Sequence, residues 1–128
     1  MKIRGIIRPE AVTAELDETV SKAAKRMRLH QVSALPVVEH DRLVGIVTER
    51  DITRAVAEET DPATTTVAEI MTQHPLIAAP DDEAETVAMR MLEHGIRHAP
   101  VVENNRLVGV VSVRDLLMLE IWPPPSLR

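Results

Sequence analysis

Two short motifs in the chain carry side chains that could bind a ligand, and the two motifs have the same spacing. In each, a glycine is followed after three residues by a hydroxyl and after three more by a carboxylate: Gly45, Thr48, Asp51 and Gly109, Ser112, Asp115. A hydroxyl three residues ahead of a carboxylate is the pattern of a capping box at a helix start. The first turn of such a helix offers free N–H groups and a positive dipole end to an anion.

These motifs belong to a longer repeat. The segments 35–51 and 99–115 align without a gap, 64 positions apart, and both begin with a Pro-Val-Val strand pattern. Turn-forming residues then follow at 40–42 and 104–106, before a second apolar run and the helix start. Because both strands are apolar on both faces, other elements should cover both sides of them.

An amphipathic helix precedes each pair of strands. Apolar residues at i, i+3, i+4 and i+7 predict a helix from about residue 20 to His30, and a second helix that ends at Gly95. Asp17 and Asp81 are the expected N-caps. Short extended segments, 11–16 and 75–80, come before these helices.

The sequence therefore predicts an α/β (α+β) fold of two β-α-β-β-α repeats. The first repeat with its N-terminal lead-in takes residues 1–60, a linker takes 61–66, and the second repeat with the C-terminal tail takes 67–128. One repeat alone has too little core to be stable. We therefore expect the two to pack with pseudo-two-fold symmetry.

The amino-acid composition argues against several classes of function. The net charge of −5 disfavours nucleic-acid binding, and with no Phe or Tyr and a single Trp, aromatic stacking platforms are lacking. There is no Cys, so disulfides and Cys–zinc sites are excluded. No apolar run reaches the length of a signal peptide or a membrane span, which favours a cytoplasmic protein that does not bind membranes.

Catalytic motifs are lacking as well. The sequence has no Gly-x-Ser-x-Gly elbow, no P-loop and no Rossmann fingerprint, so we expect no enzyme and no catalytic cofactor. His94 and His98 have metal-like spacing, but Gly95 interrupts the helix between them. We therefore expect no metal site.

The paired pattern resembles the CBS domains, regulatory repeats named after cystathionine β-synthase; a tandem pair is also called a Bateman module. The resemblance covers about residues 10–120. It implies a stand-alone sensor module that binds AMP, ADP, ATP or S-adenosylmethionine in clefts between the repeats and transmits occupancy to a protein partner. In this family the Asp usually takes the ribose hydroxyls, and the Thr or Ser often meets the phosphate.

The same resemblance indicates further ligand-binding positions. Basic residues just before the second strand pattern would contact phosphate, and the short extended segments would flank the adenine ring. The full candidate set is Thr13, Ala14, Ser33, Ala34, Pro36, Thr48, Arg50 and Asp51 in the first repeat, and Ile77, Ala78, Arg97, His98, Pro100, Ser112, Arg114 and Asp115 in the second.

Each candidate also has a purely structural interpretation. The hydroxyl–carboxylate pairs could be caps only, Arg97 and His98 solvated residues at the strand start, Arg50 and Arg114 surface ion pairs, and residues 13–14 and 77–78 core edge. The matching alternative function is a ligand-free, dimeric protein-interaction scaffold.

The final helix predicts self-association. It carries more apolar residues than one face can bury: Leu116, Leu117, Met118, Leu119, Ile121 and Trp122. We expect a homodimer through helices that include Leu119 and Trp122. The alternative is that Trp122 folds back onto the N-terminal isoleucines.

Overall fold

The computed structural model describes residues 1–8 and 12–121, and its contacts divide the chain into two compact units. We call residues 11–75 the repeat-1 unit, and residues 1–10 with 76–128 the repeat-2 unit. Each unit is described by itself below.

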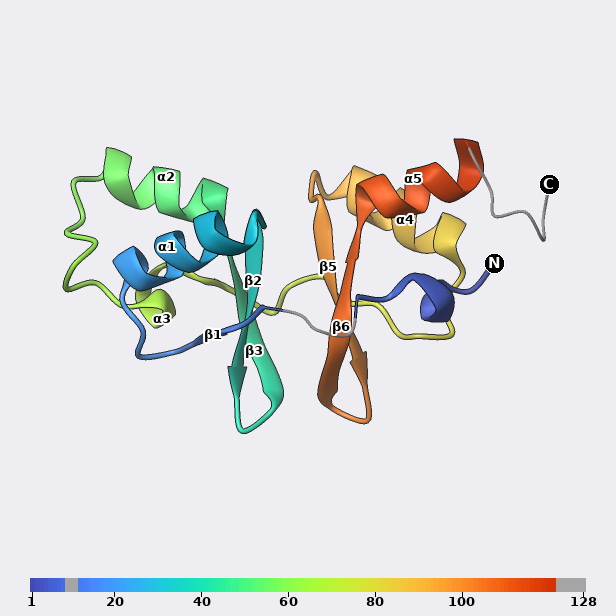
Figure 1. The fold of residues 1–128 in the computed structure, drawn as a ribbon, viewed down its shortest axis with the longest axis horizontal. Helices are drawn as coiled ribbons and strands as arrows, with labels where there is room; N and C mark the ends of the chain where they lie inside the picture. Colours follow the sequence, from blue (N-terminus) through green and yellow to red (C-terminus); the bar gives the residue numbers. More distant parts are fainter. Residues whose placement is uncertain (9–11, 122–128) are drawn as a thin grey trace. The chain divides into compact units, whose positions relative to one another are not determined.

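The repeat-1 unit is a four-stranded sheet with helices. The strands follow the order β1-β2-β3-β4, with β1 parallel to β2 and the other neighbours antiparallel. Its elements, labelled in Figure 1 except for β4, are β1 (Ala14–Glu15), α1 (Val20–His30), β2 (Ala34–Glu39), β3 (Arg42–Thr48), α2 (Glu49–Ala57), α3 (Val67–Ile70) and β4 (Thr72–Gln73).

The repeat-2 unit has the matching elements. The strands β5 and β6 form an antiparallel hairpin, and Ala78 adds a parallel bridge to Val101. Its elements are a 3-10 helix η1 (Ile3–Ile6), α4 (Ala84–Glu93), β5 (His98–Glu103), β6 (Arg106–Ser112) and α5 (Val113–Ile121). The structure thus has the predicted mixed α/β class, with the predicted order of elements in both repeats.

Each compact unit differs in make-up from the sequence ranges 1–60 and 67–128, which stay a prediction for the domain bounds. The N-terminal lead-in packs with the second repeat, where Ile3 is fully buried in the core and its amide donates to the Asp82 carbonyl at 3.0 Å. The matching segment after the linker packs with the first repeat, where Val67 is fully buried. The core of the second repeat therefore includes the N-terminal lead-in, and the core of the first repeat includes the segment that directly follows the linker.

The predicted N-caps at Asp17 and Asp81 are wrong. The N-cap of α1 is Thr19, whose hydroxyl accepts from the Lys22 amide at 3.2 Å, and the N-cap of α4 is Glu83. The chain first makes a turn in which the Glu18 carboxylate accepts from the Glu15 amide, so the helix starts two residues later. The ends fit better: α1 ends at His30, and α4 ends at Glu93, shortly before Gly95 with φ +64°.

Helix α5 places its apolar residues on different sides. Leu116 is buried and Leu119 packs against the core of the repeat-2 unit, whereas Leu117 and Met118 are exposed. Leu119 is therefore partly buried against the core of its own unit. Trp122 lies outside the described residues. Among those described, no helix is both long enough and apolar enough to cross a membrane.

Candidate ligand-binding site

The motif glycines mark a close approach of two backbones. A Cβ on Gly45 would lie 2.9 Å from the Thr72 carbonyl oxygen, and one on Gly109 would lie 2.6 Å from the Arg8 carbonyl oxygen. Both distances are too short for a side chain. The glycines thus allow the segment ending at Thr72, or the lead-in ending at Arg8, to cross the strand that leads to the helix start.

The first helix start is a closed capping box. The Asp51 amide donates to Thr48 Oγ1 at 3.2 Å, while the Asp51 carboxylate accepts from the Thr48 amide at 2.9 Å and from its hydroxyl at 3.0 Å. The Asp51 side chain is only 5% exposed. Its other oxygen, Oδ1, lies 3.8 Å from Arg54 Nη1.

The second helix start holds its carboxylate differently. The Asp115 amide donates to Ser112 Oγ at 3.0 Å, as in a cap. The two carboxylate oxygens, however, accept from Arg8 of the lead-in: Nε donates to Oδ2 at 3.0 Å and Nη2 to Oδ1 at 3.1 Å. At 27% exposure, the Asp115 side chain is more open to solvent than that of Asp51.

The residues at the start of the first strand of each hairpin lie beside these helix starts. Ala34 pairs with Thr48 across β2 and β3, and the Glu49 amide donates to the Ser33 carbonyl at 2.9 Å. In the repeat-2 unit, His98 pairs with Ser112, and the Val113 amide donates to the Arg97 carbonyl at 2.8 Å. The structure therefore brings residues 33–34 beside Thr48 and residues 97–98 beside Ser112.

The extended segments lie one strand further along. Ala14 pairs with Val37, next to Pro36, and the Ala78 amide donates to the Pro100 carbonyl at 3.0 Å. Ala14, Pro36, Ala78 and Pro100 are buried, whereas Ile77 is exposed. Ala14 and Ala78 thus lie against the first strand of each hairpin, and their contact with adenine stays a prediction.

The arginines that precede the two aspartates, Arg50 and Arg114, are both exposed. The ion-pair contact recorded for Asp51 is with Arg54, one helical turn later. An exposed arginine on the first turn of the helix is compatible with either interpretation, a phosphate contact or a solvated charge.

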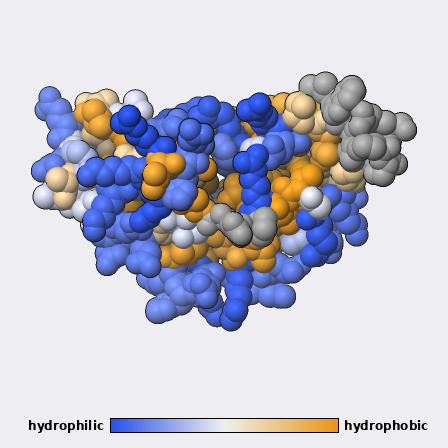
Figure 2. Space-filling model, viewed as in Figure 1, coloured by the Kyte–Doolittle hydropathy of each residue, from blue (hydrophilic) through white to orange (hydrophobic). Residues whose placement is uncertain are grey.

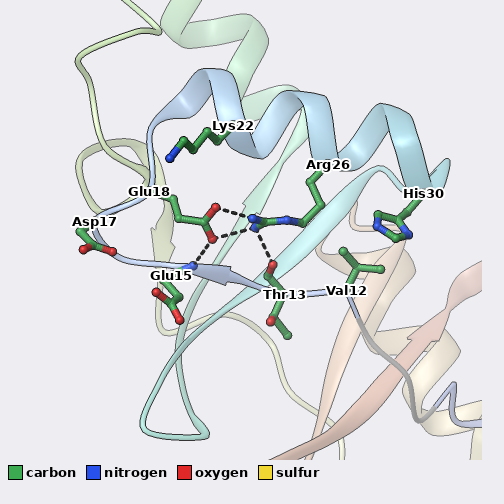
Figure 3. Close-up of a pocket in the computed structure, with 8 residues that line it drawn as sticks. All are labelled: Val12, Thr13, Glu15, Asp17, Glu18, Lys22, Arg26 and His30. Atoms are coloured by element: carbon green, nitrogen blue, oxygen red, sulfur yellow. Dashed lines mark hydrogen bonds and ion pairs between the residues drawn. The ribbon is translucent and has the colours of Figure 1, made fainter.

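A polar groove lies on the α1 side of β1, with a volume of about 780 Å³ (Figure 3). Its lining includes Thr13, Lys22 and His30. Arg26 points into it, donating from Nη1 to the Thr13 carbonyl at 2.9 Å and to Glu18 Oε1 at 2.7 Å. The hydrogen bonds from Arg26 lower the pKa of Glu18, and the same contact raises the pKa of Arg26. This pair fixes the strand segment that carries Thr13.

Sequence reasoning missed two residues that shape the site, Arg8 and Arg26. Arg8 stands 64 positions before Thr72, so the repeat offset already aligned a cation with a neutral residue. Arg26 sits on α1 with no motif that distinguishes it from a solvated arginine. Over residues 1–8 and 12–121, no group of three or more His, Asp or Glu side chains could hold a metal ion.

Comparison with known proteins identifies a family with the same duplicated sequence pattern. The model of the CBS domain family matches the chain twice, over residues 3–58 and 67–120. The CBS domain-containing protein YhcV of Bacillus subtilis is 32% identical over 89% of this chain and 81% of its own length. The chain is also 34% identical to the L-aspartate semialdehyde sulfurtransferase of Methanocaldococcus jannaschii, but it covers only 23% of that enzyme.

Two solved structures with bound ligands are similar. The CBS domain pair of protein MJ0100, in complex with 5′-methylthioadenosine and S-adenosyl-L-methionine, has a TM-score of 0.86 at 33% identity, covering 94% of this chain and 95% of that one. The CBS domain protein PAE2072 of Pyrobaculum aerophilum, complexed with AMP, has a TM-score of 0.83 at 29% identity, covering 90% and 89%. The matches indicate no enzymatic family, although an enzyme among the relatives carries such domains as a part. With both repeats matched and the paired fold shared, this chain belongs to the CBS domain family and contains two CBS domains.

Proposed function

We propose that this chain is a regulatory module that binds an adenosine-containing ligand, such as AMP, ADP, ATP or S-adenosylmethionine, at the helix starts of its two CBS domains. In each domain, the Asp accepts hydrogen bonds from the ribose hydroxyls, and the positive dipole end at the start of α2 or α5 attracts the anionic group. The neighbouring aliphatic segments, which include Ala14 and Ala78, pack against the adenine.

The observation that carries this proposal is the duplication of one complete arrangement. In each unit a hydroxyl and a carboxylate at a helix start lie beside the same strand ends, with a glycine that admits a crossing segment. A cap alone does not need an aspartate, because a glutamate also closes the box. The two similar structures with bound adenosine compounds lend further support.

A thermal-shift panel tests the proposal. At a ligand concentration near 100 times Kd, mass action should add about 2.7 kcal/mol to the stability. For a chain of 128 residues this should raise Tm by several degrees. The absence of any shift with millimolar AMP, ADP, ATP and S-adenosylmethionine would contradict ligand binding.

Arg97 and His98 make the second domain the better phosphate site. Their counterparts in the first domain are Ser33 and Ala34, which carry no charge. Arg97→Ala should therefore weaken the binding of AMP more than that of adenosine, which lacks the phosphate. Equal losses for both ligands, measured by calorimetry, would show that Arg97 acts through packing instead.

Ligand occupancy would be transmitted to a protein partner through a change in the populations of two states. A ligand can shift such an equilibrium only by binding the two states with unequal affinity. The expected readout is therefore reciprocal: a partner protein that prefers the bound state should also tighten the binding of the nucleotide.

A second candidate function, a dimeric interaction scaffold, rests on exposed apolar residues. Met89 and Leu92 of α4 and Leu117 and Met118 of α5 are exposed, and the two helices pack against each other. Figure 2 shows hydrophobic areas among hydrophilic ones on the face that it displays. The four positions 64 residues earlier are mostly charged: Lys25, Arg28, Thr53 and Arg54.

We place the homodimer contact on the exposed apolar residues of α4 and α5, because Leu119 packs on the core of its own unit. These residues are Met89, Leu92, Leu117 and Met118. Leu117→Lys with Met118→Lys should convert a dimer to a monomer in light scattering at tens of micromolar. Leu29→Lys, at an exposed leucine of α1, is the matched control and should leave the mass unchanged. A monomer mass for the wild type would exclude the dimer, and a scaffold role would further require that no adenine nucleotide binds.

A further inference from the structure

The carboxylate of Asp115 is already occupied by a side chain from the far end of the sequence. Arg8 donates two parallel hydrogen bonds to it, from Nε to Oδ2 at 3.0 Å and from Nη2 to Oδ1 at 3.1 Å. A guanidinium and a carboxylate match in this two-pronged geometry, which is the strongest form of such a pair. Both carboxylate oxygens of Asp115 are thereby engaged.

The position of Arg8 is built into the fold. Its amide donates to the Val110 carbonyl at 3.1 Å, and its carbonyl accepts from the Val110 amide at 3.3 Å. Gly109, next to Val110, leaves room for this crossing. The backbone therefore holds Arg8 beside the helix start whatever its side chain does.

The first domain has no equivalent of this contact at the matching position. Thr72 crosses Gly45 there, and its side chain is too short and uncharged to form such a pair. The Asp51 carboxylate instead accepts from the amide and hydroxyl of Thr48. The two domains thus present the same carboxylate with different occupants.

We propose that Arg8 is an internal competitor for the ligand site of the second domain, a latch that must release Asp115 before a ribose can bind there. This inference rests on the proposed function, because it concerns the regulation of the same site. A ribose diol would use the same two oxygens that Arg8 holds. The free energy of the Arg8–Asp115 pair is therefore subtracted from ligand affinity at Asp115, whereas the Arg54 contact of Asp51 is longer, at 3.8 Å.

The latch is weak enough to open. The Arg8 side chain is 70% exposed and that of Asp115 27%, and solvent screens exposed pairs. Removal of the guanidinium should tighten the binding of a ribose ligand to the second domain by about fivefold, near the upper end for such pairs.

The test uses adenosine, which has no phosphate for a freed guanidinium to contact. Arg8→Ala and Arg8→Thr, the latter giving the residue that crosses the motif glycine in the repeat-1 unit, are titrated with adenosine and compared with the wild-type chain. The amide NMR signals of Ser112 and Asp115 report the second domain alone. The matched control is Arg4→Ala, which removes another lead-in arginine that pairs with Asp81 and Glu103.

We expect both Arg8 variants to bind adenosine about fivefold more tightly at Ser112 and Asp115, and Arg4→Ala to match the wild type. If the wild type binds adenosine but neither Arg8 variant binds it more tightly, the latch is wrong and the proposed function stands. If no variant and no wild-type signal responds to adenosine or AMP at millimolar concentration, the proposed function and the latch fail together.

Discussion

The two helix starts of this chain share a motif but differ in the state of its carboxylate. Asp51 is nearly fully buried and closes a box with Thr48, whereas Asp115 is partly exposed and is held by Arg8. The difference does not arise within the motif, because Ser112 can cap as Thr48 does. It arises from the segment that crosses the motif glycine, which ends in Thr72 in one unit and in Arg8 in the other. The partner of a ligand-binding carboxylate can thus be set by residues far away in the sequence.

The largest effect on stability is expected from a substitution that displaces the segment crossing Gly109. Gly109→Ala should destabilise the chain by about 3 kcal/mol, because the new Cβ would overlap both the Ile7 side chain and the Arg8 backbone. The free energy of unfolding in urea measures this. Displacement of Arg8 would also remove the difference between the two units.

Alanine substitutions at two other glycines serve as comparisons for the stability cost of Gly109→Ala. Gly45→Ala should cost less, since the nearest atom is the flexible Met71 sulfur, although the Thr72 oxygen also lies close. Gly5→Ala meets nothing within 4 Å and should be nearly neutral. A cost for Gly109→Ala no larger than that for Gly5→Ala would refute the close-approach account.

The next largest effect is a difference between the two aspartates in the stability cost of replacing each by asparagine. Asp51→Asn should cost about 1–2 kcal/mol, because the buried group loses charge-assisted bonds to Thr48. Asp115→Asn should cost less than about 1 kcal/mol, because an exposed ion pair contributes little. Chemical denaturation at pH 7 gives both values, and a reversed order would contradict the assigned environments.

The smallest effect concerns the acid dependence of the Arg26–Glu18 pair. The pKa of Glu18 is lowered by its hydrogen bonds to Arg26, so the pair stabilises the fold above the unfolded pKa of about 4.3. This stabilisation is lost as the pH falls through the lower, folded pKa.

Arg26→Met should therefore cost up to about 1 kcal/mol at pH 7, and the deficit should shrink below about pH 4.3. Urea unfolding of both proteins at pH 7, 5 and 3.5 measures the difference. Arg90→Met, 64 positions later, controls for lost packing, since the carboxylate in that unit is the shorter Asp82. A deficit for Arg26→Met that stays constant over this pH range would show that the charge pair contributes nothing.

Local patterns predicted much of this fold. Apolar spacing located α1 and α4, and the hydroxyl–carboxylate spacing located the starts of α2 and α5. The turn residues are also where expected, with φ of 53° and 64° at His40 and Asp41, a geometry that Asp and Asn tolerate. The predicted N-caps were wrong because a turn closed by Glu18 or Asp82 precedes each helix, so the N-caps are Thr19 and Glu83, two residues later.

What the sequence did not reveal depends on long-range packing. The repeat offset matched Ile3 with Val67, yet it could not say which repeat each would complete. The Arg8–Asp115 contact spans 107 positions and follows from that packing, so no local pattern indicates it. The candidate residues themselves were predicted mainly through the family resemblance. Their ligand contacts remain predictions.

The most direct test of the central claim is calorimetric titration of AMP into the wild type, Asp51→Asn and Asp115→Asn. If the aspartates hold ribose, each variant should lose more than about tenfold in affinity at one site, while the fold remains intact by thermal melting. Equal AMP affinity in the wild type and both variants would show that the two aspartates only cap their helices.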